Sequence, residues 1–384
     1  MQRYLSDRLT ADLQKKLVFL TGPRQVGKTT LSRQLMQTSD AQYLNYDVAA
    51  DRAVIARASW RSQSQLLVLD EIHKMADWKS WLKGVVDGKP SGQQLLVTGS
   101  ARMDTFRQSG ESLAGRFYSL RLHPLSVREW CEHAPQDLHG GQRPTPEEAL
   151  ARLLERGGFP EPMLDTERQG ADRWRRQYID GLVREDVLEF SRIQQLTSMR
   201  LFVDLLRHRV GSPLSLASMA RDLAVSPPTL RNYLGILQAL FVVFAVHPWH
   251  RNIARSVLQQ PKIYFFDTGL VQGDEGVRFE NLTACHLLKH AQWQQDALGR
   301  ECALHYLRTK DGAEVDFALS DGERLTGLIE CKWADPAPHR ALLRFAGELP
   351  AAHAVQLVRS LRQPEQRGPV QIARAADWLA QLSA

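Results

Sequence analysis

The chain has 384 residues, of which 43% are hydrophobic and 24% are charged. These are ordinary proportions for globular proteins, so a disordered chain is not expected and two or three packed units are. The formal net charge of +6 permits an anionic partner. Most of the excess lies before residue 140, however, and charge alone is weak evidence for nucleic acid.

Neither a membrane span nor a disulfide framework is expected. The most apolar stretch, residues 237–246, is about half as long as a bilayer span and is followed by His247 and Pro248. The N-terminal residues carry charge throughout, which does not fit a signal peptide. The cysteines stand far apart with no CxxC pair, at Cys131, Cys285, Cys302 and Cys331. We therefore expect a cytoplasmic protein without membrane association.

The first chemical motif follows a short apolar segment, residues 16–21, that predicts a buried strand. The motif has the spacing GxxxxGK[ST] and precedes an apolar helical pattern. In this order, Gly22 and Gly27 let successive backbone N–H groups face phosphates at a helix N-terminus. Lys28 is expected to reach the β- and γ-phosphates of ATP, and Thr29 to offer its hydroxyl to Mg²⁺. The predicted nucleotide-binding residues are Gly22, Pro23, Arg24, Gln25, Val26, Gly27, Lys28, Thr29 and Thr30.

A second apolar strand, predicted over residues 66–69, ends in the carboxylates Asp70 and Glu71. Asp70 is expected to hold Mg²⁺, commonly through water, together with Thr29. Glu71 is expected to orient and activate the attacking water, the role that distinguishes hydrolysis from binding. The two motifs together predict an ATPase that uses ATP and Mg²⁺.

Three further residues are candidates for contact with the γ-phosphate. A third apolar strand, starting at residue 95, ends in small hydroxyl residues, of which Ser100 is the preferred sensor candidate and Thr98 the second. Arg116 is placed where a neighbouring subunit could use it as an arginine finger. A structural or solvated arginine explains the sequence equally well. A homo-oligomer, possibly a ring, is expected only if Arg116 acts between subunits.

The order of five segments resembles that of a known group of ATPases. The segments are GPRQVGKTT, YLNYD, LLVLDEIHK, TGSARMD and LAGRFYSLRLHPLS. They resemble the bacterial and archaeal AAA+ ATPases whose C-terminal half is a domain of unknown function, and the resemblance extends over nearly the whole chain. It implies a doubly wound α/β domain with a parallel sheet for residues 1–140. Where many AAA+ proteins have Asn at the sensor position, this chain has Ser100.

Residues 141–198 are expected to form a helical lid or linker. A cluster of Gly and Pro opens it, and helical spacing follows over residues 146–156 and 172–190. The second of these helices carries the basic group Arg173, Arg175 and Arg176. The group could face DNA or a subunit interface, although a solvated helix face is the simpler interpretation.

The pattern of residues 199–250 predicts a winged-helix-like module. An apolar helix, a break at Gly211, a helix over residues 216–223 and a further helix opened by Ser226 follow one another, and residues 241–246 would supply wing strands. Winged helices bind DNA but also serve as protein interfaces, so both roles remain open. In the first role the last helix would present Thr229, Arg231 and Asn232 to a groove.

Residues 251–384 carry four residues with the order of a nuclease site. Glu280 lies on a predicted helix, Asp316 on a strand, and Glu330 and Lys332 two positions apart on the next strand, so that they share a face. This order resembles the PD-(D/E)xK arrangement of the restriction-endonuclease fold. The resemblance implies carboxylates that bind Mg²⁺ and a lysine that orients water for phosphodiester cleavage.

Catalysis does not follow from that resemblance alone. The same fold also holds branched or duplex DNA without cutting it. Alternatively, the acids could pair with Arg308 and Lys310 as a polar cluster, and Gln356 could add a polar contact.

The sequence thus favours an ATP-driven machine that acts on DNA, in repair, recombination or defence. The alternative is an ATP-gated switch that binds a protein partner and has a non-catalytic nuclease-like domain. A nuclease licensed by ATP is a third possibility. The fold class expected is α/β, with a P-loop AAA+ domain followed by a helical and winged-helix part and a C-terminal α/β domain.

Overall fold

The computed structural model divides into two compact units. One comprises residues 1–123 and 239–241, and the other comprises residues 124–238 and 242–384. The boundary thus falls before helix α6 (Val127–His133), whereas the sequence places it near residue 140. The residues that the structure describes are 1–99, 113, 115–182, 196–250, 260–349 and 352–384.

The first unit is built on a parallel sheet of five strands in the order β2-β3-β4-β1-β5. Short apolar runs form these strands, and β1 and β3 are buried at every position. Because β4 lies between β1 and β3, the carboxyl ends of all three meet at one edge. The strands are β1 (Leu17–Thr21), β2 (Ala41–Asn45), β3 (Leu66–Asp70), β4 (Gln94–Thr98) and β5 (Phe117–Arg121).

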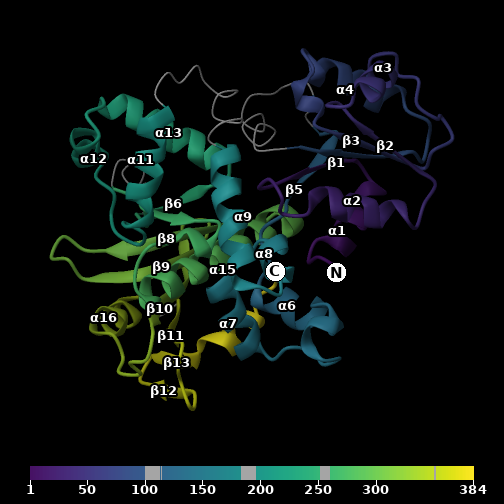
Figure 1. Cartoon of the computed structure of the whole chain (residues 1–384). Coiled ribbons are helices and arrows are strands. Elements are labelled where there is room, and N and C mark those ends of the chain that lie inside the picture. Colours follow the sequence, from purple (N-terminus) through teal and green to yellow (C-terminus); the bar gives the residue numbers. More distant parts are fainter. Residues whose placement is uncertain (100–112, 114, 183–195, 251–259, 350–351) are drawn as a thin grey trace. The chain divides into compact units, whose positions relative to one another are not determined.

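Helices cover this sheet, as Figure 1 shows. An aromatic cluster fixes one side, where the ring of Phe19 lies 6.0 Å from that of Trp78 and 5.0 Å from that of Phe117. Such edge-to-face pairs add to the burial of apolar area. The helices are α1 (Ser6–Leu13), α2 (Lys28–Met36), α3 (Ala49–Ala56) and α4 (Trp78–Gly88), with a 3₁₀ turn η1 (Ile72–Lys74).

The second unit begins with helices that have strong N-terminal signals. Ser126 with Glu129 and Thr145 with Glu148 form reciprocal capping boxes at α6 and α7. These helices are α6 (Val127–His133), η4 (Gln136–His139), α7 (Pro146–Arg156), α8 (Pro160–Leu164) and α9 (Arg168–Gly181).

A three-helix segment and a strand pair follow in the order that the winged-helix prediction requires. Strands β6 and β7 pair antiparallel, and Pro213 forms a bridge to Lys262 on β7. On α13, Arg231 and Asn232 are exposed, whereas Thr229 is half-buried and its hydroxyl contacts that of Ser226. The elements are α11 (Leu196–Arg207), α12 (Leu216–Asp222), α13 (Pro227–Ala239), β6 (Val243–Pro248) and β7 (Lys262–Phe265).

The same two strands belong to a mixed sheet of eight strands in the order β12-β13-β11-β10-β9-β8-β6-β7. Strand β6 joins it by parallel pairing with β8, so the sheet crosses the boundary expected near residue 250. The remaining strands are β8 (Cys302–Arg308), β9 (Glu314–Asp321), β10 (Arg324–Lys332), β11 (His353–Val358), β12 (Glu365–Arg367) and β13 (Val370–Arg374).

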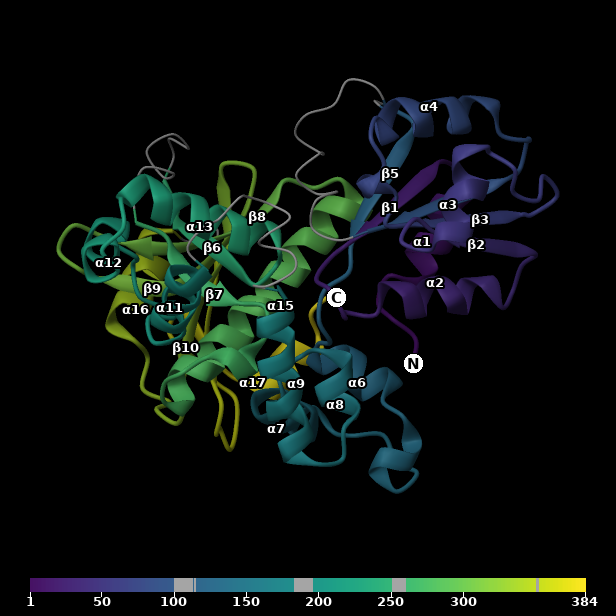
Figure 2. The same ribbon diagram turned by 45° about the horizontal axis from the view of Figure 1, so that its top comes forward.

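Helix α15 runs along this sheet in contact with β7, β8, β9 and β10, which Figure 2 shows from a second direction. Helix α16 packs through Leu342 and Phe345 into an apolar cluster with Leu328 and Val358 of the sheet. The helices of this part are η6 (Thr268–Leu270), α15 (Glu275–Leu298), α16 (Arg340–Glu348) and α17 (Ala375–Ala380). In the part of the chain that the structure describes, no helix is long and apolar enough to cross a bilayer.

Candidate functional site

The predicted phosphate loop connects β1 to α2 and has the backbone that such a loop requires. Gly22 has φ +145°, and a Cβ there would lie 2.3 Å from the Leu122 carbonyl oxygen. Gly27 has φ +102° and lies at the start of α2, so its left-handed backbone directs the chain into the helix. Lys28 is buried, and its Nζ donates hydrogen bonds to the carbonyls of Gly22 (2.9 Å) and Pro23 (2.7 Å). The loop and its lysine therefore form one compact cradle.

Asp70 is the centre of the polar contacts beside this loop. Its Oδ1 accepts a hydrogen bond of 2.6 Å from the Thr98 hydroxyl, and its Oδ2 accepts one from the Tyr43 hydroxyl. The Thr29 hydroxyl lies 3.5 Å from Oδ2. Parallel pairing of β2, β3 and β4 brings these groups to one edge of the sheet. Tyr43 was not predicted, because a tyrosine in a half-buried strand is usually a packing residue.

Glu71 follows directly, in the left-handed conformation with φ +56°. Its Oε2 lies 3.5 Å from His73 Nε2 and 3.8 Å from Lys74 Nζ. Burial, together with the neighbouring Asp70 carboxylate, raises the pKa of Glu71 above its ordinary value, although Lys74 opposes the rise. A carboxylate with a raised pKa is a better proton acceptor than an ordinary one.

The residues present fit Mg²⁺. This ion prefers oxygen ligands and is usually held by one or two carboxylates, with substrate phosphates and water completing the shell. The Asp70 carboxylate and the Thr29 hydroxyl supply protein oxygens of that kind within 3.5 Å of each other. The metal-binding and catalytic roles themselves remain predictions.

The three γ-phosphate candidates have different outcomes. Ser100 lies outside the described residues, whereas Thr98, the second candidate, is buried and bonded to Asp70. Arg116 forms an exposed ion pair with Asp87, at 2.8 Å between Nε and Oδ1. Its guanidinium is therefore accessible from outside the unit, and action on a second subunit stays a prediction.

The four nuclease-like residues of the second unit do come together. The β9–β10 ladder ends at the pair Phe317–Ile329. Beyond it, the Asp316 backbone N–H donates to Glu330 Oε2 (3.3 Å), and the Cys331 N–H donates to Asp316 Oδ2 (2.9 Å). Side-chain oxygens thus replace backbone pairing where the two strands separate.

The neighbours of these carboxylates divide them into two groups. Lys332 Nζ lies 2.8 Å and His339 Nδ1 3.2 Å from Glu330 Oε1. Although burial acts to raise it, the hydrogen bonds from His339 and Lys332 lower the pKa of Glu330. Burial and the nearby acids instead raise the pKa values of Glu280 and Asp316.

The sequence did not predict the cation that serves this second group. Lys262, the first residue of β7, is only 1% exposed. Its Nζ lies 2.7 Å from Glu314, 3.5 Å from Glu280 and 3.9 Å from Asp316. Arg308, which the sequence suggested as a partner of the acids, pairs instead with Glu314, at 2.9 Å between Nη1 and Oε2.

These residues do not fit a divalent metal ion. The ammonium group of Lys262 already lies among the oxygens that would have to ligate one. Among the described residues, no group of three or more His, Cys, Asp or Glu side chains is arranged to hold a metal. The cluster has the residue types of the nuclease arrangement, but Lys262 fills the space that a metal ion would need.

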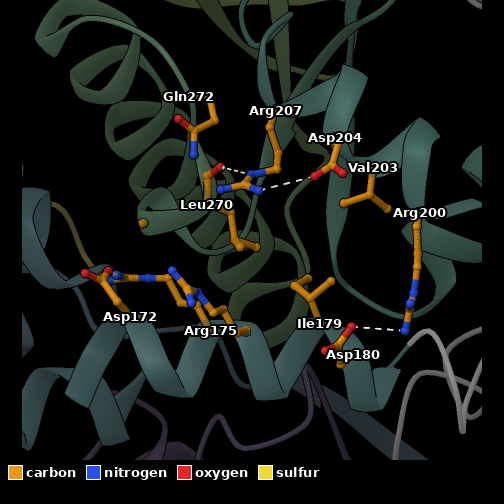
Figure 3. A pocket seen from close by; sticks show the side chains of 12 residues that line it. Asp172, Arg175, Ile179, Asp180, Arg200, Val203, Asp204, Arg207, Leu270 and Gln272 are labelled. Carbon is orange, nitrogen blue, oxygen red and sulfur yellow. Dashed lines mark hydrogen bonds and ion pairs between the residues drawn. The ribbon is translucent and has the colours of Figure 1, made fainter. Parts of the chain in front are cut away.

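A pocket of about 420 Å³ lies between α9 and α11 of the same unit (Figure 3). Two of its arginines face acids: Arg200 lies 3.1 Å from Asp180 and Arg207 lies 3.3 Å from Asp204. Arg175, expected on a solvated or DNA-facing helix surface, is buried and pairs with Asp267 at 3.1 Å. The charges that line the pocket are therefore largely balanced, so the pocket has little attraction for a phosphate.

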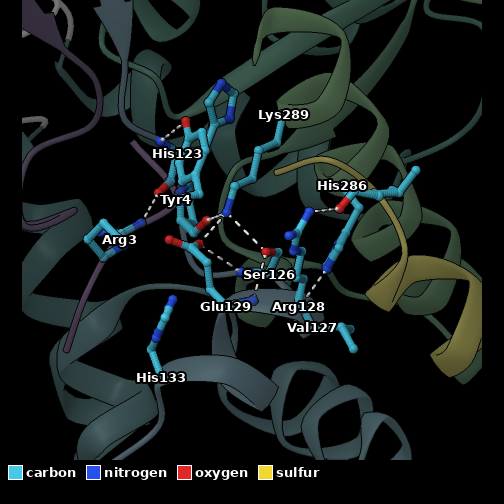
Figure 4. A network of polar contacts seen from close by, with 12 residues as sticks. Arg3, Tyr4, His123, Ser126, Val127, Arg128, Glu129, His133, His286 and Lys289 are labelled. Atoms are coloured by element: carbon cyan, nitrogen blue, oxygen red, sulfur yellow. Dashed lines mark hydrogen bonds and ion pairs between the residues drawn. The ribbon is translucent and has the colours of Figure 1, made fainter. Parts of the chain in front are cut away.

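A buried polar network joins α6 to α15 (Figure 4). Lys289 Nζ bonds to Glu129 and to the Ser126 hydroxyl at 3.1 Å. The Val127 N–H donates to His286 Nε2 at 2.9 Å, and burial lowers the pKa of His286 to about 4. The ring is therefore neutral, and this network is structural rather than catalytic.

The parallel sheet, the loop between β1 and α2, and the carboxylates that end β3 define a P-loop ATPase fold. In agreement, residues 14–131 match a family model described as an AAA domain. Residues 147–277 and 275–376 match two domains of unknown function, DUF8612 and DUF4143. The AAA-type resemblance is thus confirmed, while the restriction-endonuclease-like fold stays a prediction.

Two relatives of the chain are described as uncharacterized proteins. The protein Rv2008c of Mycobacterium tuberculosis is 29% identical over 334 residues, covering 85% of this chain and 72% of that protein. MJ1544 of Methanocaldococcus jannaschii is 22% identical over 330 residues, covering 79% and 72%. Among solved structures, the Walker-type ATPase PABY2304 of Pyrococcus abyssi has a TM-score of 0.44 at 15% identity, covering 72% of this chain and 94% of that one.

Proposed function

We propose that the protein is a Mg²⁺-dependent ATPase. The observation that carries the proposal is the meeting of Lys28, Thr29 and Asp70 at one sheet edge, with Glu71 directly after Asp70. Lys28 and the loop amides would bind the phosphates, while Thr29 and Asp70 would hold the ion. When bound, Mg²⁺ would neutralise charge that develops on the phosphates.

Glu71 would accept the proton of the attacking water. Among the described residues, none donates a hydrogen bond to its buried Oε2, which lies beside His73 and Lys74. Replacement Glu71→Gln preserves shape but removes the base. We expect hydrolysis to fall by about 10²–10⁴-fold with ATP binding retained. Lys28→Ala should instead weaken ATP binding itself, and hydrolysis that survives Glu71→Gln would refute the role of Glu71.

We propose further that Arg116 acts on ATP bound to another copy of the chain. Its exposed guanidinium and its position between β4 and β5 support this role. Arg116→Ala should lower the rate by roughly 10³-fold without loss of ATP binding. Asp87→Ala is the matched control, because it breaks the same ion pair and keeps the arginine. Equal losses in the two variants would show that Arg116 is structural.

For the target of the ATPase we propose duplex or branched DNA. The order of α11, α12, α13 and the β6–β7 pair, with Arg231 and Asn232 exposed on α13, supports this choice. DNA should stimulate hydrolysis, and Arg231→Ala should weaken the response while Arg324→Ala, an exposed control in the same unit, should not. The assay compares ATP turnover with duplex, single-stranded and four-way-junction DNA at low salt.

The alternative is a nucleotide-gated switch that binds a protein partner. The cation already present at the carboxylate cluster favours a C-terminal domain that does not cut DNA. Turnover that depends on Glu71 but is unchanged by every DNA would support the switch and refute the DNA target.

A further inference from the structure

The second unit holds a lysine where its carboxylates would require a metal ion. Three acids from two elements converge on Lys262 Nζ: Glu314 and Asp316 from β9 and Glu280 from α15. Only 1% of the Lys262 side chain is exposed, so water has little access to its ammonium group. A buried charge is tolerated when it is paired, and this pairing is threefold.

The surrounding bonds hold the acids in place around the ammonium group. The Tyr264 hydroxyl donates to Glu280 Oε1 at 2.7 Å, and the Cys331 N–H donates to Asp316 Oδ2 at 2.9 Å. Three carboxylates within 3.9 Å of Nζ favour the charged form of Lys262, and the strand that carries Lys262 fixes its position.

We propose that Lys262 is a built-in cation that replaces a divalent metal ion at the cluster of Glu280, Glu314 and Asp316. The oxygens of Mg²⁺ ligands lie about 2.0–2.1 Å from the ion, so an ion would have to occupy the space around Nζ. Like charges at such separation repel strongly in a buried site. The cluster is thus neutralised without metal, because the ammonium group of Lys262 takes the place that an ion would need.

This inference is independent of the ATPase and of its target. It predicts that the C-terminal domain does not cleave DNA through these carboxylates, since the chemistry that the metal supplies is absent. It also predicts a gain of function. Removal of the ammonium group should leave preorganised carboxylates that attract a divalent cation.

The experiment measures Mn²⁺ binding to the full chain by electron paramagnetic resonance. All variants carry Asp70→Asn, so that the candidate ATP site does not contribute. Lys262→Met should bind Mn²⁺ at least about tenfold more tightly than its parent, because a like charge has been removed from the site. Adding Asp316→Asn should abolish the gain. Lys310→Met, which removes an exposed lysine of the same domain, should produce none.

Two further measurements decide the matter if Lys262→Met unfolds. Lys262→Arg keeps the charge and should gain no Mn²⁺ affinity. In the parent, Asp316→Asn should leave Mn²⁺ binding unchanged, because the cluster holds no ion. Mn²⁺ binding by the parent that Asp316→Asn removes would overturn the proposal, as would equal Mn²⁺ affinity of the Lys262→Met variant and its parent.

Discussion

The pH at which ATP hydrolysis is lost on the acid side of its pH–rate profile should depend on Lys74, which lies beside the proposed base. Its Nζ is 3.8 Å from Glu71 Oε2 and also pairs with Asp47 at 2.7 Å. Lys74 lowers the pKa of Glu71, while burial and Asp70 raise it. A base must be ionised to accept a proton, so activity is lost as pH falls through its pKa. Lys74→Met should therefore move the acid limb to higher pH.

The size of this shift can be estimated from the contact. Two unit charges about 4 Å apart interact by about 1 kcal/mol in water and about 4 kcal/mol at an effective dielectric constant of 20. A value near the lower one is used, because Lys74 shares its charge with Asp47. Since one pKa unit corresponds to about 1.4 kcal/mol, the acid limb should rise by roughly 0.7 pH unit.

The assay is the pH dependence of kcat/KM for ATP, which reports the free enzyme. Asp47→Asn is the matched variant, and its effect should have the opposite sign. It removes a negative charge that raises the pKa of Glu71, and Lys74 then pairs with Glu71 only. The limb should then move to lower pH. Shifts in the same direction for both variants, or none for Lys74→Met, would refute the assignment of Glu71 as the titrating base.

Other outcomes follow from the backbone and the buried network. Gly22→Ala combines a positive φ with a Cβ 2.3 Å from a carbonyl oxygen and should destabilise the first unit by about 3 kcal/mol in denaturant unfolding. Gly84→Ala, in open space on α4, should stabilise it by up to about 1 kcal/mol. Lys289→Met leaves Glu129 buried without its cation and should cost about 3–5 kcal/mol, most of which Glu129→Gln in the same chain should restore. His286 has a folded pKa of about 4 against about 6.5 unfolded, so its contribution is complete above pH 6.5 and is lost as pH falls toward 4. Between pH 7 and pH 5 this loss of stability is about 2 kcal/mol. Hydrogen exchange of residues 124–133 should report the loss in the parent, and His286→Gln should abolish this pH dependence.

The first unit could be predicted well because its signals are local. Residues 17–21 and 66–70 are continuous apolar runs, which is how strands buried on both faces appear in a sequence. The loop between β1 and α2 needs glycine at two positions, and the sequence has it at Gly22 and Gly27. The hairpin that joins Asp316 to Glu330 was likewise predictable from spacing, and β9 and β10 form it.

Contacts over long sequence separation could not be predicted in this way. Tyr43 reaches Asp70 only because β2 and β3 pair in one register. Lys262 lies 52 positions before Glu314, and nothing in the short apolar strand that it opens indicates an acidic partner. Arg175 looked like a member of a solvated basic group, yet the fold buries it against Asp267. In each case the partner is determined by the tertiary arrangement rather than by local pattern.

The placement of Lys262 has a consequence for where the second unit can be divided. Strand β7 pairs with β6, and β6 in turn pairs with β8. A fragment that begins at residue 251 would keep Lys262 but lose the strand that positions it. Lys262 would then no longer be held beside the three carboxylates, and unpaired charges are costly in a buried site. The β6–β7 pair and the carboxylate cluster therefore depend on each other, and we expect a fragment that retains β6 to be more stable than one that begins at residue 251.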